Sequence, residues 1–129
     1  MSPNKEKTIL VVDDDKELCE ILVDQLTRAG FKTLSAHDGE EGLKVALEHK
    51  PNLILLDVMM PKMDGIKMLE KLREHEWGKK VPVVLLTVMD QPEVLSRAVE
   101  LGGYEYFVKT DWKIEEIVER VKQKLAAQF

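Results

Sequence analysis

The sequence predicts an α/β fold in which one parallel sheet lies between two layers of helices, a three-layer sandwich. Two observations lead to it. Five short apolar segments alternate with segments of helical periodicity along the 129 residues. No spacing between successive strands fits a hairpin turn, since every connection is long enough to contain a helix. Together they predict a five-stranded parallel sheet, wound right-handed, with helices on both faces.

Segments rich in β-branched and apolar residues predict the strands. The second is the most polar, as suits an edge strand, whereas the third is an unbroken apolar run that ends in the carboxylate of Asp57. Pro82 is tolerated near the first residue of the fourth strand. We expect strands at residues 8–12, 31–36, 53–57, 81–87 and 104–108.

Apolar residues at helical spacing predict five helices. Asp38 and Asp111 can cap the second and the last, Pro92 suits the first turn of the fourth, and Gly30 suits the left-handed position after the first. We expect helices at residues 16–29, 38–49, 64–76, 92–101 and 111–129. The apolar stripes of the first and last comprise Leu18, Ile21, Leu22 and Leu26, and Ile114, Ile117, Val118, Val121 and Leu125.

Composition limits the classes of protein. With 44% hydrophobic and 33% charged residues, the chain is expected to form one domain at residues 8–129 after a poorly ordered tail at 1–7. A net charge of −5 with mixed signs provides no basic stripe, so direct nucleic-acid binding is not expected. Without an apolar signal or membrane-length run, and with one cysteine, a cytoplasmic location is expected.

Cysteine and histidine provide no recognisable metal site. Cys19 is interpreted as a small core residue of a helix, because no histidine lies nearby in sequence to activate it. His37, His49 and His75 are scattered without metal-ligand spacing and are interpreted as surface residues.

Polar residues end or follow most of the strands, where apolar runs stop. They are Asp13, Asp14, Asp57, Thr87 and Lys109. The carboxyl ends of parallel strands share one edge, so we expect these residues to meet there. With strand order 2-1-3-4-5, the winding reverses between the first and third strands, where such folds bind ligands. Each residue alone also suits a strand end or helix cap, but one shared edge favours function.

The expected cluster suits phosphoryl chemistry. Three carboxylates within a few ångströms repel one another, which implies a counter-charge, and hard oxygen ligands in an open cleft suit Mg²⁺. Lys109 can pair with Asp57 or with phosphoryl oxygens, and the Thr87 hydroxyl can donate to those oxygens. A carboxylate nucleophile, a divalent cation, a lysine and a hydroxyl are the parts needed to form and hold an acyl phosphate.

Four stretches resemble one known family. They are residues 11–15 (Val-Val-Asp-Asp-Asp), 55–65 (Leu-Leu-Asp-Val-Met-Met-Pro-Lys-Met-Asp-Gly), 86–87 (Leu-Thr) and 106–109 (Tyr-Phe-Val-Lys). At these separations the chain resembles the receiver domain of two-component response regulators over essentially its whole length. The resemblance implies the flavodoxin-like (βα)5 fold. It also implies a receiver domain at residues 8–129.

The resemblance implies that Asp57 accepts a phosphoryl group from a phosphohistidine on a sensor histidine kinase or phosphotransfer protein. Asp14, Asp57 and the backbone carbonyl of Met59 would hold Mg²⁺, with Asp13 acting through water. Lys109 and Thr87 would contact the phosphoryl group, and Thr87 and Tyr106 would form the switch pair. Asp15 is better interpreted as a helix N-terminal residue. Such a protein catalyses only its own phosphorylation and dephosphorylation, and is not an enzyme in the ordinary sense.

Three departures from the family pattern bear on this site. Thr110 follows Lys109 where the family has a cis proline, and a non-proline cis bond costs about 3 kcal/mol, so we expect a reshaped loop. Val88 is larger than the usual residue and narrows the entrance to Asp57. Met59 and Met89 flank the site where polar residues align the hydrolytic water, so we expect slow loss of the phosphoryl group. Residues 102–104 (Gly-Gly-Tyr) also depart, without a physical explanation.

The sequence is compatible with more than one kind of output. Tyr104, Tyr106 and Trp112 surround the expected switching face of helix 4, strand 5 and helix 5, either as an interface or with Trp112 only packing at its helix start. No effector follows Phe129, so the chain acts on an unknown output protein or belongs with an effector. A phosphorylation-linked homodimer is a further alternative.

Three other functions fit the sequence less well. A haloacid dehalogenase-type hydrolase also forms an aspartyl phosphate but needs a second acid two residues after the nucleophile, where Met59 stands. A degenerate receiver, binding partners without phosphorylation, would not need the intact acidic set. A nucleotide-binding domain would need a glycine-rich loop after the first strand, which is absent.

Overall fold

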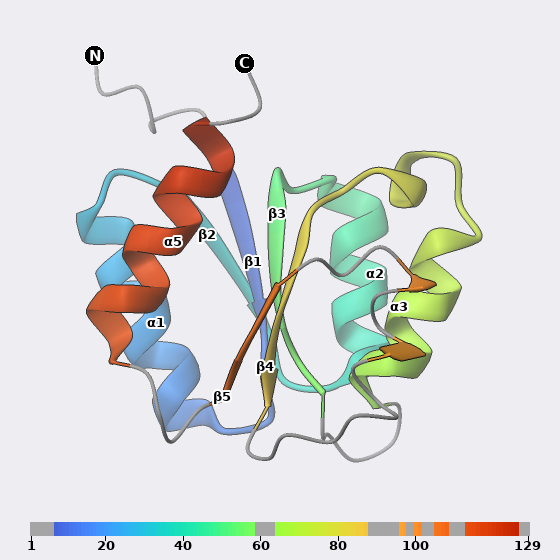
Figure 1. The fold of residues 1–129 in the computed structure, drawn as a ribbon, viewed down its shortest axis with the longest axis horizontal. Helices are drawn as coiled ribbons and strands as arrows, with labels where there is room; N and C mark the ends of the chain where they lie inside the picture. The colour runs from blue at the N-terminus through green and yellow to red at the C-terminus, as the bar shows by residue number, and fades with distance from the viewer. Residues whose placement is uncertain are drawn as a thin grey trace.

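The computed structural model describes residues 7–58, 64–87, 96–97, 100–101, 105–108 and 113–126, with only the backbone described at 87 and 105–108. Five parallel strands form one sheet in the order β2-β1-β3-β4-β5 (Figure 1). This order confirms the predicted fold class and the reversal of winding between β1 and β3. The strands are β1 (Thr8–Val12), β2 (Lys32–Ala36), β3 (Leu53–Asp57), β4 (Val83–Thr87) and β5 (Glu105–Val108).

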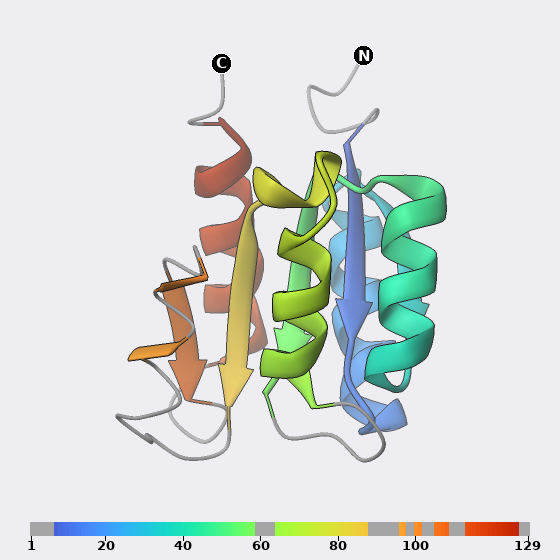
Figure 2. The ribbon, with the colours of Figure 1, turned by 90° about the vertical axis from the view of Figure 1, so that its right-hand side faces the viewer.

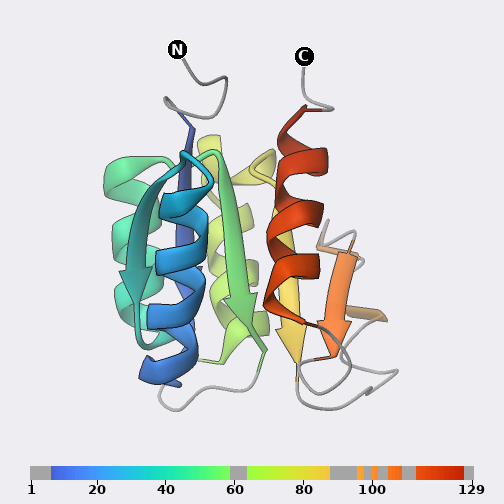
Figure 3. The ribbon, with the colours of Figure 1, turned by 90° about the vertical axis from the view of Figure 1, so that its left-hand side faces the viewer.

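Helices cover both faces of the sheet. Those described are α1 (Lys16–Arg28), α2 (Gly39–His49), α3 (Gly65–Arg73) and α5 (Ile114–Ala126), with a 3₁₀ turn, η1 (Trp77–Lys79). Helices α2 and α3 lie in front of the sheet in Figure 2. From the opposite side, α1 and α5 lie in front (Figure 3). The predicted helix at 92–101 falls mostly outside the described residues.

Two apolar cores result, one on each face of the sheet. Successive side chains of a strand point to opposite faces, so Ile9 and Val11 pack under α1 and α5 whereas Leu10 and Val12 pack under α2 and α3. A sheet covered on both faces needs apolar residues at every position. All five residues of β3 are buried, which explains why its sequence is an unbroken apolar run up to Asp57.

The first helix begins as predicted but faces differently. Asp15 caps it and Gly30 follows it with a φ of 102°, as expected. However, Ile21 is 47% exposed, so its assignment to the apolar stripe was wrong. Each residue turns the helix by about 100°, which places Ile21 well away from the line of buried residues. That line consists of Cys19, Leu22 and Leu26.

The third helix ends at Arg73, earlier than the predicted Glu76. The chain then folds back, because Gly78 lies so close to Leu72 that a β carbon would overlap the Leu72 carbonyl oxygen. Residues 77–79, predicted as loop, form η1, and β4 starts at Val83 instead of Val81. Tertiary contacts therefore override helix-compatible sequence here.

The start of the chain joins the sheet at Lys7. Its carbonyl oxygen accepts a hydrogen bond of 2.9 Å from the backbone N–H of Lys32. Residues 1–6 of the predicted tail lie outside the described residues. Among the described residues, no helix has the length and apolar character needed to cross a membrane.

Candidate functional site

Three carboxylates meet at the edge where β1 and β3 end. Asp13 and Asp14 follow β1, Asp57 is the last residue of β3, and the two strands pair directly. One oxygen of each side chain lies within 4.8 Å of the others. The prediction that these strand ends bring the three acids together is therefore confirmed.

Local hydrogen bonds fix Asp13. Its backbone N–H donates to the Ala36 carbonyl at 3.1 Å, which ties it to the end of β2. Its Oδ1 accepts the backbone N–H of Asp15 at 2.9 Å. Asp13 has no exposed surface and Asp57 only 2%, whereas Asp14 is exposed. Two of the three acids in the cluster are therefore buried, and the third faces solvent.

The backbone around Asp57 is also held on both sides. The N–H of Val58 donates to the Leu86 carbonyl at 2.9 Å, and the N–H of Gly65 donates to the Val58 carbonyl at 2.9 Å. A β carbon on Gly65 would overlap the carbonyl oxygen of Asp57. The start of α3 therefore lies directly against the strand end that carries Asp57.

Helix N-termini surround the cluster. Asp15, Asp38 and Asp64 cap α1, α2 and α3, each accepting a backbone N–H, at 3.1, 2.8 and 2.8 Å. In a parallel sheet these helices begin at the edge where the strands end, so their positive dipole ends face the acidic residues. The predicted roles of Asp15 and Asp38 as helix-cap residues are confirmed.

This donor set fits a hard divalent cation. Carboxylate oxygens are the ligands that Mg²⁺ prefers, and Mg²⁺ keeps several waters while taking few protein ligands. A site with two buried acids and one exposed acid leaves room for such waters. The mutual repulsion of three negative charges also favours a bound cation.

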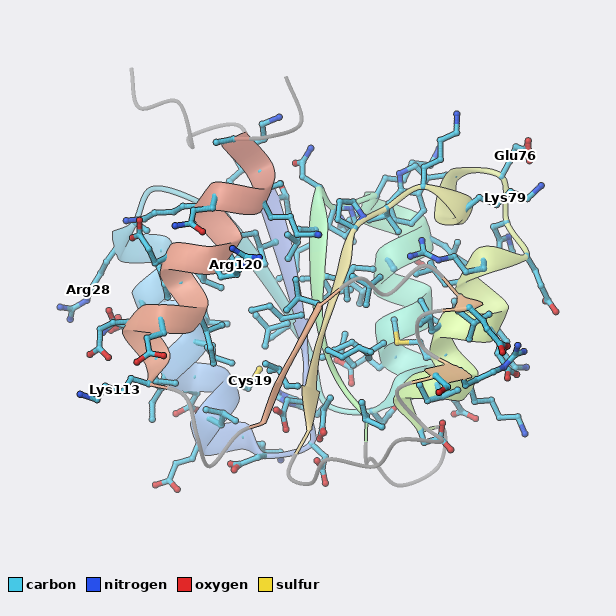
Figure 4. All side chains as sticks on the ribbon, viewed as in Figure 1. Cys19, Arg28, Glu76, Lys79, Lys113 and Arg120 are labelled. Carbon is cyan, nitrogen blue, oxygen red and sulfur yellow. The ribbon has the colours of Figure 1, made fainter. Side chains whose placement is uncertain are left out.

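Cys19 is not part of the acidic cluster, but burial and the charge of Asp13 raise the pKa of its thiol. Its thiol is buried between α1 and the sheet, with Sγ 4.0 Å from the Val11 carbonyl oxygen (Figure 4). Burial, followed by the negative charge of Asp13, raises the pKa of this thiol to about 11. A thiol of such pKa stays protonated near neutral pH, which agrees with the interpretation of Cys19 as a core residue.

His37, predicted as a surface residue, lies at the surface beside the acidic edge. It is half-buried, and its ring Nδ1 lies 3.3 Å from the Asp13 carbonyl oxygen. Its position after the second strand was the available signal, since that strand ends at the same edge. His49 and His75 are exposed, as predicted.

The remaining predicted site residues are placed only in part. Thr87 is the last residue of β4 and its neighbour Leu86 pairs with Asp57, so the Thr87 backbone lies at the acidic edge. Tyr106 lies in β5, in register with Leu85. The Thr87 and Tyr106 side chains lie outside the description, as do Met59, Val88, Met89, Lys109, Thr110, Asp111, Trp112 and residues 102–104.

The chain is similar to proteins of known family. The family model described as "Response regulator receiver domain" matches residues 9–122. The alkaline phosphatase synthesis transcriptional regulatory protein PhoP of Bacillus subtilis is 40% identical over 90% of this chain and 47% of its own. The chain thus spans about half the length of the curated relatives it matches.

Solved structures agree with this comparison. A CheY-like receiver domain protein from Methanospirillum hungatei superimposes with a TM-score of 0.87 at 28% identity, covering 95% of both chains. The Francisella response regulator 1452 receiver domain gives 0.85 at 29% identity, covering 96% of this chain and 100% of that one. With the family match, the fold and the acidic edge together, this chain belongs to the response regulator receiver domain family.

Proposed function

We propose that Asp57 accepts a phosphoryl group from a phosphohistidine of a sensor histidine kinase or phosphotransfer protein. The observation that supports this most is the acidic cluster of Asp13, Asp14 and Asp57, located where β1 and β3 end in a receiver domain. Asp57 is the last residue of β3 and lies beside the exposed Asp14, so the proposed acceptor stands at the edge of the sheet that a donor protein would approach. The receiver domain is proposed to extend over residues 8–129.

The transfer is a displacement at phosphorus. An oxygen of the Asp57 carboxylate forms the new P–O bond as the P–N bond to the donor imidazole breaks, and the leaving nitrogen takes up a proton. Asp14, Asp57 and the Met59 carbonyl would hold Mg²⁺, with Asp13 acting through water. The cation supplies charge neutralisation at the phosphoryl oxygens.

Asp13 has a separate task in this proposal. The hydrogen bonds from its backbone N–H to Ala36 and from the Asp15 N–H to its Oδ1 keep the Asp13 carboxylate beside the nucleophile. The Thr87 hydroxyl and the Lys109 ammonium are proposed to contact the phosphoryl oxygens. The same Thr87 would move toward the phosphoryl group while Tyr106 turns inward, which links the chemistry to the face around helix 4, β5 and α5.

The output is proposed to be state-dependent binding of another protein through that face. The PhoP protein named above is a transcriptional regulatory protein about twice as long as this chain, so an output in gene regulation is consistent with the similarity. Sedimentation before and after phosphorylation measures whether the modification also links two copies of the chain. We propose a cytoplasmic location, where kinases of this kind phosphorylate their receivers.

Slow loss of the phosphoryl group forms part of the proposal. Met59 and Met89 lack the polar groups that align a hydrolytic water, and a valine at position 88 would narrow the approach to Asp57. The phosphorylated protein should therefore persist for minutes or longer in Mg²⁺. Decay within seconds, followed by mass spectrometry or by phosphate release, would contradict this part while leaving the acceptor assignment intact.

Intact-mass spectrometry after incubation with acetyl phosphate tests the acceptor role. Wild type should gain the mass of one phosphoryl group with Mg²⁺ and gain nothing with a chelator. Asp57→Asn should gain nothing under either condition. An unmodified wild type would favour the degenerate, phosphorylation-independent receiver, and steady turnover of a phosphomonoester would favour the hydrolase.

A further inference from the structure

A second site candidate lies at the opposite edge of the sheet, where the strands begin. A groove of about 370 Å³ is formed by the segments that lead into β3 and β4. Glu76 and Lys79 mark this end of the molecule at the upper right of Figure 4, away from the strand ends. Its main lining residues are Lys50, Pro51, Asn52, Trp77, Lys80 and Pro82.

The floor of the groove is apolar. Pro51 and Val81 are buried, whereas Trp77 and Pro82 are half-buried and keep part of their surface toward solvent. Trp77 also packs against the core under α2 and α3, which limits its movement. An indole beside prolines provides a rigid apolar contact surface of the kind that anchors interfaces.

Asn52 adds a fixed polar group. Its Oδ1 accepts the backbone N–H of Thr8 at 2.7 Å, and its own backbone N–H donates to the Thr8 carbonyl at 2.7 Å. Because the amide oxygen of Asn52 faces Thr8, the NH₂ group of the same side chain is left as a donor. In the described part of the chain that NH₂ makes no hydrogen bond.

The charges that line the groove are mainly positive. Lys50 and Lys80 are exposed, and neither forms an ion pair with any residue that the structure describes. The acid at this site, Glu76, is engaged by Lys79 at 3.0 Å. Lys50 also adopts a left-handed backbone (φ 47°) where glycine or asparagine is usual, so the chain carries a lysine here at a cost in stability.

Arg73 makes one wall rigid. Its Nη1 donates to the carbonyl oxygens of Gly78 and Val81 at 2.7 and 2.8 Å, and its Nε donates to that of Leu101 at 2.6 Å. The first two bonds fix the backbone on either side of Lys80. A wall fixed in advance loses little entropy when a ligand binds.

We propose that this groove binds a short, extended acidic segment of a partner protein. Carboxylates of the segment would pair with Lys50 and Lys80, an apolar side chain would pack on Trp77 and the prolines, and the Asn52 amide would donate to a backbone carbonyl. Charge complementarity decides the occupant. The acidic edge around Asp57 repels such a segment, whereas the lysines of the groove attract it. The segment would therefore bind in the groove and leave the Asp57 site free for its own ligands.

Tryptophan fluorescence tests the proposal directly. In a Trp112→Phe background Trp77 is the only tryptophan of the chain. Titration with an end-blocked, glutamate-rich peptide with interspersed leucines should give a saturable change in its emission. The Kd should rise about tenfold in Lys50→Gln/Lys80→Gln, because two exposed charge contacts are lost. Since the assay involves no phosphorylation, its outcome is independent of the proposed role of Asp57.

Matched controls separate the groove from general charge effects. Lys44→Gln/Lys71→Gln removes the same charge at exposed positions outside the groove and should leave the Kd unchanged. No saturable change, equal weakening by both pairs, or equal binding of a lysine-rich peptide would overturn the proposal. So would displacement by inorganic phosphate at constant ionic strength, which assigns a small-anion site. Tenfold tighter binding after deletion of residues 1–6 would instead make that segment the occupant.

Discussion

The α carbon of Gly65 lies directly against the backbone carbonyl of Asp57, with no room for a β carbon between them. The Gly65 N–H also donates to the carbonyl of Val58, the residue after Asp57, at 2.9 Å. These two contacts place the first turn of α3 on the strand end that carries the proposed phosphoacceptor. The position of Asp57 and the start of α3 are therefore set together.

Gly65→Ala should disturb both the position of Asp57 and the start of α3. The added methyl group forces backbone to move against backbone, which should lower the free energy of unfolding by about 1–3 kcal/mol. Phosphorylation by acetyl phosphate should also slow, because Asp57 shifts relative to Asp13 and Asp14. Urea denaturation and intact-mass kinetics measure the two effects. Lys67→Ala, an exposed change in the same helix, should alter neither beyond about 0.5 kcal/mol; equal behaviour of the two variants would refute the close contact.

Mg²⁺ should stabilise the protein through the acidic cluster. At a free concentration about ten times its Kd, the ion adds about 1.4 kcal/mol, visible as a higher Tm. Asp14→Asn should abolish this gain. Without Mg²⁺ it should raise stability by about 0.5 kcal/mol, because one repelling charge is gone. Asp24→Asn, an exposed change within α1 and outside the cluster, should keep the Mg²⁺ response; a response retained in Asp14→Asn would place the ion elsewhere.

Arg73 should matter far more for stability than an exposed arginine. Its guanidinium donates to three backbone carbonyls from separate segments. Arg73→Met leaves these oxygens without that donor, and we expect a loss of about 2–4 kcal/mol in urea denaturation. Arg28→Met provides the control, since Arg28 points into solvent and only pairs with Asp24 at 3.0 Å (Figure 4). Its loss should stay under about 1 kcal/mol; similar losses for both would mean that the Arg73 bonds contribute little.

Cys19 should make stability fall at alkaline pH. Its pKa is raised from 9.0 to about 11, because burial and nearby carboxylates disfavour the thiolate. The unfolded chain therefore releases this proton first, so the contribution is complete below pH 9 and is lost as pH rises toward 11. Cys19→Ala should lack this part of the decline. Denaturation of both proteins across that pH range measures the difference, and parallel curves would contradict the shifted pKa.

Much of the fold follows from local sequence. The buried run before Asp57 and the aspartates at helix starts are short-range signals, because strand burial and N-capping depend on neighbouring residues. The acidic cluster could also be predicted from the sequence, since the carboxyl ends of parallel strands lie at one edge of the sheet. Asp13, Asp14 and Asp57 needed only the strand order to be brought together.

Contacts between segments that are distant in the sequence could not be predicted from such local signals. Helix α3 ends at Arg73 because Gly78 folds back on Leu72, which helix-compatible residues at 74–76 do not reveal. The position of His37 depends on a contact with Asp13, 24 residues away. For Ile21 the spacing itself misled, because a residue three positions from Leu18 can lie on either border of a helix stripe.

Reductive trapping tests the central claim most directly. Borohydride reduces an aspartyl phosphate to homoserine, so peptide mapping after acetyl phosphate, Mg²⁺ and borohydride identifies the acceptor by position. Homoserine at residue 57 alone is the predicted result. Homoserine at position 13 or 14, or a phosphorylated protein that yields none, would contradict the assignment of Asp57.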